Sequence, residues 1–152
     1  MSNVIDTDRV ERSIVINGSR ERVWRALTNA EEFGAWFGVD FSGQRFEPGK
    51  RVRGAKTMGG CDGLFFEATI DRIEPQEMMS FHWHLKLDGP ESSEEPTLVT
   101  FTLKDAGGKG ILLTVIESGF DKLPPQHRRK AFELHSEGWE IQMKKVAGYA
   151  GN

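Results

Sequence analysis

Apolar and polar residues alternate along much of the chain, which is the pattern of strands that bury one face. In the clearest example Met79, Phe81 and Trp83 are each followed by a polar residue. The segments that share this strand pattern are 10–16, 51–58, 63–73, 79–87, 99–103 and 113–117. Most of these segments follow one another through short turns, so we expect them to form one antiparallel sheet.

Helical periodicity is confined to three segments. Ser19 and Asn29 are predicted N-caps of two short helices, and Gly38 is predicted to end the second. The segment 123–150 opens on two prolines and repeats bulky side chains every three or four residues, which predicts one long helix. At about 1.5 Å per residue such a helix is on the order of 37 Å long and needs a broad surface. The order of elements predicts an α+β fold in which the last helix covers the sheet.

The length and composition narrow the expectations further. We interpret residues 1–8 as a disordered N-terminal tail and residues 9–152 as a single domain. A net charge of −3 and a pI near 5.8 do not indicate a basic surface that would bind phosphates, so we expect no nucleic-acid partner. The single Cys61 excludes an internal disulfide and has no evident activating base. Without a long apolar run or a signal-peptide pattern, we expect no membrane partner and a cytoplasmic location.

Several short motifs, in this order, are similar to those of a known family. They are Glu21–Thr28 after the first strand and turn, Trp36-Phe37-Gly38, Glu74-Pro75 followed by Phe81-His82-Trp83, Ser118-Gly119-Phe120, and His135–Trp139. Together they resemble the START-like (SRPBCC) superfamily, and more closely the family named for the activator of the 90-kDa heat-shock protein ATPase. The resemblance extends over 10–147. It implies a helix-grip fold, in which a curved antiparallel sheet of six to seven strands wraps the long C-terminal helix and leaves a cavity.

The resemblance does not imply one activity. Members of the superfamily include lipid and hormone binders, polyketide cyclases and chaperone cofactors. Function must therefore be argued from the side chains that the fold brings together.

Three polar side chains are candidates for chemistry in such a cavity. Alternation places Glu117 on the buried face of its strand. There it could anchor a ligand or act as a general base. The alternative is that its carboxylate simply reaches solvent at the end of the strand. His135 lies on the buried stripe of the long helix and could pair with Glu117, or it could be an ordinary core histidine. Arg12 interrupts the apolar face of the first strand. Its guanidinium could bind an acidic group of a ligand, or it could extend to the solvent-exposed rim of the cavity.

Large aromatic rings are more numerous than a plain two-layer core of this size requires. The residues predicted to form the wall of a ligand cavity are Phe81, Trp83, Phe101, Val115, Trp139 and Met143, with Trp36, Phe37 and Phe41 at its mouth. The alternative is a fully packed interior without a usable void.

No motif points to a metal or cofactor. His82 and His84 share the outer face of their strand, and no third ligand stands at a diagnostic spacing. The chain also has no phosphate-binding GxxxxGK[ST] motif and no GxSxG nucleophile elbow. We therefore expect no bound metal and no cofactor.

These observations favour a protein that binds a small apolar or amphipathic molecule between sheet and helix, with Glu117 and His135 or Arg12 as polar anchor. One alternative is an enzyme of the polyketide-cyclase type, with Glu117 and His135 as acid and base. Another is a protein-interaction module of the chaperone-cofactor type, which would expose an apolar or charged patch. Whether the chain forms a homodimer is left open.

Overall fold

The computed structural model describes residues 9–57, 65–83, 96–122 and 125–151. The predicted tail 1–8, Cys61, His84 and the second half of the predicted strand 79–87 therefore lie outside the described residues.

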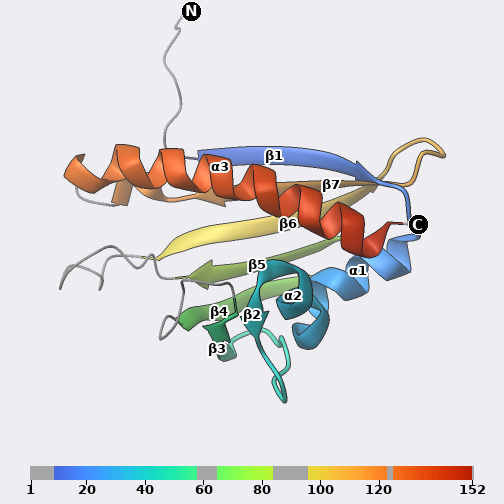
Figure 1. Ribbon diagram of the computed structural model, residues 1–152, viewed down its shortest axis with the longest axis horizontal. Helices are drawn as coiled ribbons and strands as arrows, with labels where there is room; N and C mark the ends of the chain where they lie inside the picture. The colour runs from blue at the N-terminus through green and yellow to red at the C-terminus, as the bar shows by residue number, and fades with distance from the viewer. Residues whose placement is uncertain (1–8, 58–64, 84–95, 123–124, 152) are drawn as a thin grey trace, which may run out of the picture.

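One antiparallel sheet of seven strands, in the order β1-β7-β6-β5-β4-β3-β2, forms the body of the molecule. The strands are β1 Arg9–Ile16, β2 Val39–Asp40, β3 Arg51–Lys56, β4 Phe65–Glu74, β5 Met78–Trp83, β6 Thr97–Asp105 and β7 Ile111–Ser118. In Figure 1 the sheet is curved, and the long helix lies across its concave side. The predicted α+β helix-grip fold is confirmed.

Capping residues mark the N-termini of the two short helices, and a glycine marks the C-terminus of the second. The helices are α1 Arg20–Thr28, α2 Ala30–Phe37, the 3-10 turn η2 Phe120–Lys122, and α3 Pro125–Ala150. The side chains of Ser19 and Asn29 accept hydrogen bonds from the backbone N–H groups of Arg22 and Glu32, as predicted for N-caps. Gly38 ends α2 with a φ of 96°, a left-handed conformation that favours glycine.

The segment 51–58 is polar, which is typical of a strand at the edge of a sheet, but β3 lies between β4 and β2, so an interpretation as an edge strand is wrong. Val39 and Asp40 of β2 pair with Lys56 and Ala55 and cover part of its outer side. The close approach depends on Gly54, because a Cβ atom there would lie 2.4 Å from the backbone oxygen of Asp40. With only two residues, β2 is too short to show an alternating pattern in the sequence, so it was not predicted.

The space between sheet and helices is filled largely by aromatic rings centred on Phe33 of α2, which is 1 % exposed. Its ring centroid lies 4.9 to 6.4 Å from those of Trp36, Phe37, Phe41, Phe46, Phe81 and Phe101. Most pairs meet edge to face, the arrangement that the ring quadrupole favours. This packing fixes α2 against the middle of the sheet.

Ionic contacts around Glu32 connect the three helices. The carboxylate of Glu32 pairs with Arg22 and Arg25 of α1, each at 2.8 Å, and accepts a hydrogen bond from the hydroxyl of Tyr149 of α3 at 3.0 Å. Arg22 also lies over the Tyr149 ring, 4.7 Å from its centroid. The C-terminal end of α3 is thereby held against α1 and α2.

Candidate functional site

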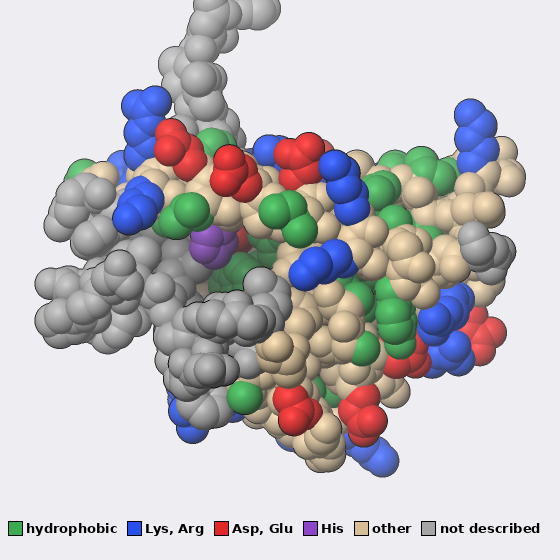
Figure 2. All heavy atoms as spheres, viewed as in Figure 1, with side chains coloured by type: hydrophobic (Ala, Val, Ile, Leu, Met, Phe, Trp, Pro, Cys, Tyr) green, Lys and Arg blue, Asp and Glu red, His purple; other side chains and the backbone are tan. Residues whose placement is uncertain are grey.

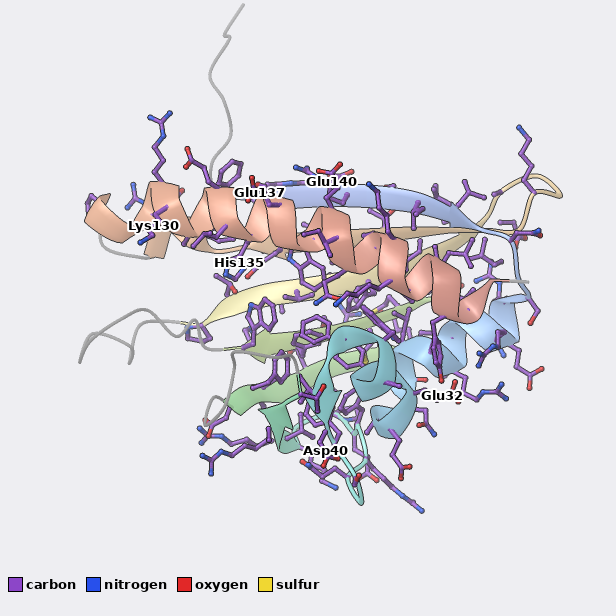
Figure 3. All side chains as sticks on the ribbon, in the orientation of Figure 1. Glu32, Asp40, Lys130, His135, Glu137 and Glu140 are labelled. Carbon is purple, nitrogen blue, oxygen red and sulfur yellow. The ribbon has the colours of Figure 1, made fainter. Side chains whose placement is uncertain are left out.

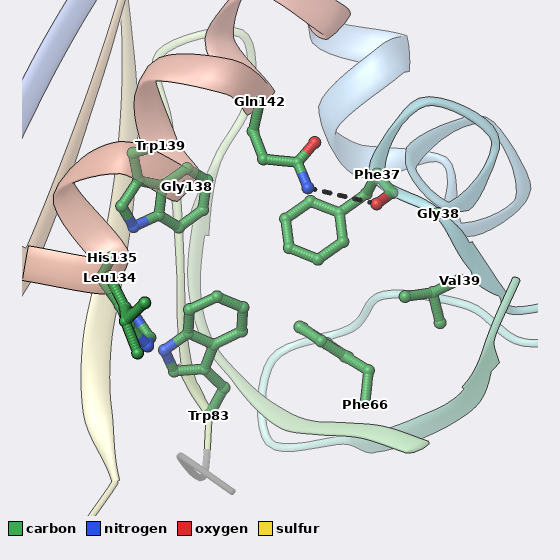
Figure 4. Close-up of a pocket in the computed structure, with 10 residues that line it drawn as sticks. All are labelled: Phe37, Gly38, Val39, Phe66, Trp83, Leu134, His135, Gly138, Trp139 and Gln142. Carbon is green, nitrogen blue, oxygen red and sulfur yellow. Dashed lines mark hydrogen bonds between the residues drawn. The ribbon is translucent and has the colours of Figure 1, made fainter. Parts of the chain in front are cut away.

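A pocket of about 280 Å³ lies between α3, the end of α2 and the strands β4 and β5. Its lining, drawn in Figure 4, consists of Phe37, Gly38, Val39, Phe66, Trp83, Leu134, His135, Gly138, Trp139 and Gln142. In Figure 2 this face is hollowed below α3, and a histidine side chain lies beside hydrophobic ones there. The pocket is therefore mainly apolar and has few polar groups, as small-molecule sites usually do.

Behind the pocket the carboxylate of Glu117 on β7 is completely buried, with 0 % exposure. Its Oε2 accepts hydrogen bonds from Trp83 Nε1 at 2.7 Å and Thr97 Oγ1 at 2.6 Å. Its Oε1 accepts from Trp139 Nε1 at 2.8 Å and lies 2.7 Å from His135 Nδ1. Four donors occupy the sites that a carboxylate offers, so the charge is fully hydrogen-bonded without solvent.

His135 joins this buried carboxylate to the pocket. Its side chain is 22 % exposed and lines the pocket, while Nδ1 faces Glu117. Figure 3 shows His135 on the sheet side of α3, opposite Glu137 and Glu140. Its ring also meets Trp83 and Phe120 edge to face, at centroid distances of 5.5 and 5.6 Å. The ring is thus held in one orientation by packing and by the carboxylate.

The environment of Glu117 keeps it ionised. Burial raises the pKa of this carboxyl, but the hydrogen bond and charge of His135 and the hydrogen bonds from Thr97 and Trp139 outweigh burial and bring the pKa below its ordinary value of 4.5. A carboxylate that holds its proton so weakly and touches no solvent is poorly suited to act as a general base. It is well suited to orient the ring of His135.

Acid should remove the contribution of Glu117 to stability. A lowered pKa in the folded chain means that the unfolded chain binds more protons, so this contribution is complete above about pH 4.5 and is lost below it. Urea unfolding of the wild type and of Glu117→Gln, from about pH 7 to about pH 3, should show a stability difference that narrows below about pH 4.5. A difference that widens in acid would contradict this assignment.

The structure brings some of the predicted site residues to the pocket but not others. Trp83, Trp139, Phe37 and His135 line it, and Glu117 lies directly behind them. The predicted wall and mouth residues that lie instead in the packed core, each at most 5 % exposed, are Trp36, Phe41, Phe81, Phe101, Val115 and Met143. They do not line the pocket because the rings of α2 fill the space above the central strands. Whether the lining residues bind a ligand stays a prediction.

Arg12 and His82 stand apart from this arrangement. Arg12 lies on edge strand β1 and donates to the backbone oxygen of Glu11, which agrees with the interpretation that it reaches the rim. His82 lies on β5 with the opposite parity to the buried Phe81. Within the described residues no cluster of three or more His, Cys, Asp or Glu side chains could hold a metal ion.

Seven described residues of the site are not among the predicted site residues: Gly38, Val39, Phe66, Thr97, Leu134, Gly138 and Gln142. Thr97 has the same parity as the buried Val99 on β6, so extending the alternation by one step would have placed it on the inner face. The others depend on the depth at which α2 and α3 lie over the sheet, which no local pattern records.

Comparison with known proteins places the chain in a family. The family model described as Activator of Hsp90 ATPase homolog 1-like protein matches residues 17–151. The chain belongs to this family. The resemblance that the motifs indicated is thereby confirmed, and membership is compatible with ligand binding, a cyclase-like role or chaperone interaction. A search of curated proteins finds no match.

Solved structures agree on the fold. Protein MLL2253 from Mesorhizobium loti is 25 % identical with a TM-score of 0.74, over 93 % of this chain and 95 % of that one. DynU16, a putative protein in the dynemicin biosynthetic locus, is also 25 % identical, with a TM-score of 0.70, over 93 % of this chain and 46 % of that one. A protein from Arthrobacter aurescens has a TM-score of 0.76 at 16 % identity, over 98 % of this chain and 89 % of that one. The last likeness shows the fold alone.

Two further observations concern partners. In the part of the chain that the structure describes, no helix has the length and apolarity needed to cross a membrane. Leu134 and Ile141 of α3 are apolar and more than half exposed. A surface for a chaperone or another protein stays a prediction.

Proposed function

We propose that this chain binds a small apolar or amphipathic molecule in the pocket below α3. The observation that carries the proposal is a mainly apolar pocket of about 280 Å³ in which His135 is the one ionisable side chain among the described lining residues. Pockets for drug-sized ligands run from about 300 Å³ upward, so this volume fits a compact molecule of one or two rings. Phe37, Phe66, Trp83 and Trp139 supply flat surfaces against which such rings pack.

Gly138 provides a direct test, because it lines the pocket and a Cβ atom added there would meet nothing within 4 Å. A leucine at this position would occupy the pocket without displacing backbone. Gly138→Leu should weaken binding of the neutral fluorescent probe N-phenyl-1-naphthylamine by roughly tenfold or more. It should also raise helix stability by about 0.5–1 kcal/mol, because glycine is a poor helix former.

Gly148→Leu is the matched control. Gly148 lies in the same helix, is exposed and also has nothing within 4 Å of an added Cβ, but it does not line the pocket. This variant should gain similar stability and keep the wild-type affinity for the probe. Native mass spectrometry of the purified protein would show any molecule that co-purifies. A chain that arrives empty and binds no probe, or equal affinities of the two variants, would rule the proposal out.

The second candidate function is catalysis of a proton transfer in the same pocket. The observation that favours it is the 2.7 Å contact between Glu117 and the Nδ1 atom of His135. Since Glu117 is sealed from solvent, His135 alone would exchange a proton with a substrate, and Glu117 would stabilise the imidazolium. This role would require a bound molecule with a reactive hydrogen beside His135.

A further inference from the structure

Gln142 of α3 forms the side of the pocket that faces the end of α2. Its Nε2 donates a hydrogen bond to the backbone oxygen of Phe37, the last residue of α2, at 3.3 Å. Figure 4 shows the amide reaching from α3 toward Phe37 and Gly38, which line the pocket with it. The side chain thus lies across the space between the two helices at this end of the pocket.

The spacing of the lining residues on α3 makes Gln142 one end of the pocket. Leu134, Gly138 and Gln142 follow one another at intervals of four residues and so share one face of the helix. Gly138 has no side chain, and a Cβ atom added there would meet nothing within 4 Å. Along α3 the pocket is therefore open over Gly138 and bounded by Leu134 and Gln142, which are about 12 Å apart along the helix axis.

Of these two ends, Leu134 is the one that can give way. It is 55 % exposed, so its side chain can turn into solvent when a ligand presses on it. Gln142 is only partly exposed, and its amide is bonded to Phe37. A ligand that is too long for the pocket can displace Leu134, but it must break the contact with Phe37 to displace Gln142. Gln142 is therefore the firmer of the two boundaries.

We propose that Gln142 sets the upper size of the ligand, so that two fused aromatic rings fit between Gln142 and Leu134 and a third ring in line with them is excluded. This inference rests on the proposed function and adds the residue that decides which aromatic molecules fit. The selection is steric, because the third ring would occupy the position of the Gln142 amide. Truncation of this side chain should therefore extend the pocket toward the end of α2.

Quinoline and acridine test the limit, because they are linear compounds of two and three fused rings with the same heteroatom, and both are neutral at mildly alkaline pH. Isothermal titration calorimetry of the wild type should show that acridine binds no more tightly than quinoline, although acridine is the more apolar compound. Gln142→Ala should bind acridine roughly tenfold more tightly than quinoline, because the additional ring then buries its apolar surface. Gln142→Ser makes nearly the same room and should show the same change.

Lys144→Ala is the matched control, because Lys144 is exposed on the same helix and does not line the pocket. It should keep the wild-type ratio of the two affinities. We expect Gln142→Ala to fold, since alanine favours a helix and the change removes an Oε1 atom that is buried without a partner among the described residues. An unchanged or higher Tm would verify this.

Two results would overturn the size limit and leave apolar binding intact. One is a clear preference of the wild type for acridine over quinoline. The other is the same ratio of affinities in Gln142→Ala as in the wild type. If the wild type binds neither compound, both this proposal and the proposed function fail.

Discussion

Glu117→Ala should destabilise the protein by about 3–5 kcal/mol, the range found when one partner of a buried hydrogen-bonded charge pair is removed. The substitution leaves the donors of Trp83, Thr97, His135 and Trp139 without their acceptor in a site closed to solvent. For a chain of this size such a loss lowers Tm on the order of 10 °C. Thermal unfolding followed by circular dichroism would measure it.

Glu117→Gln and Glu140→Gln together separate the buried network from the mere loss of a carboxylate. An amide at 117 offers one oxygen to four donors and adds two N–H groups among them, so most of the destabilisation should remain. Glu140 is an exposed residue of α3, and the same change there should alter stability by less than about 0.5 kcal/mol. Equal small effects at both positions would show that the Glu117 network contributes little.

Phe33→Ala should cost about 3–5 kcal/mol, because it removes the ring around which the aromatic core is packed and leaves a cavity. Phe33→Leu should cost distinctly less, since leucine retains much of the volume. Urea unfolding monitored by tryptophan fluorescence would report both values.

Ile141→Ala is the control for Phe33→Ala. Ile141 is 57 % exposed, so truncating it should change the free energy of unfolding by no more than about 0.5 kcal/mol. A loss below about 1 kcal/mol for Phe33→Ala would mean that the core collapses readily around the missing ring and is less tightly packed than the ring distances indicate.

The parts of the fold that the sequence predicted are those that local patterns encode. Alternation gives the strands and the inward direction of Glu117, and helical spacing places His135 on the inner face of α3. N-cap chemistry at Ser19 and Asn29 locates two helix starts within a residue. Each of these features needs only neighbours in the chain.

What could not be predicted depends on contacts between distant segments. The lateral order of the strands decides that Trp83 and Thr97 both reach Glu117, and no single segment contains that order. Residue parity likewise gives the face on which Phe81 and Phe101 lie. It does not say whether the space above them is empty, and rings of α2 occupy it. The pocket consequently lies further toward β4 and the end of α2 than the sequence suggested.

The pairing of β1 with β7 also constrains how the protein is made. Val10 lies opposite Glu117, roughly a hundred residues further along the chain, and α3 then packs over the same edge. While the chain leaves the ribosome, β1 cannot pair until Ile111–Ser118 of β7 has been synthesised. Contacts so distant in sequence slow folding. The carboxylate network also needs His135 and Trp139 of α3, so it cannot form before this last helix has been synthesised.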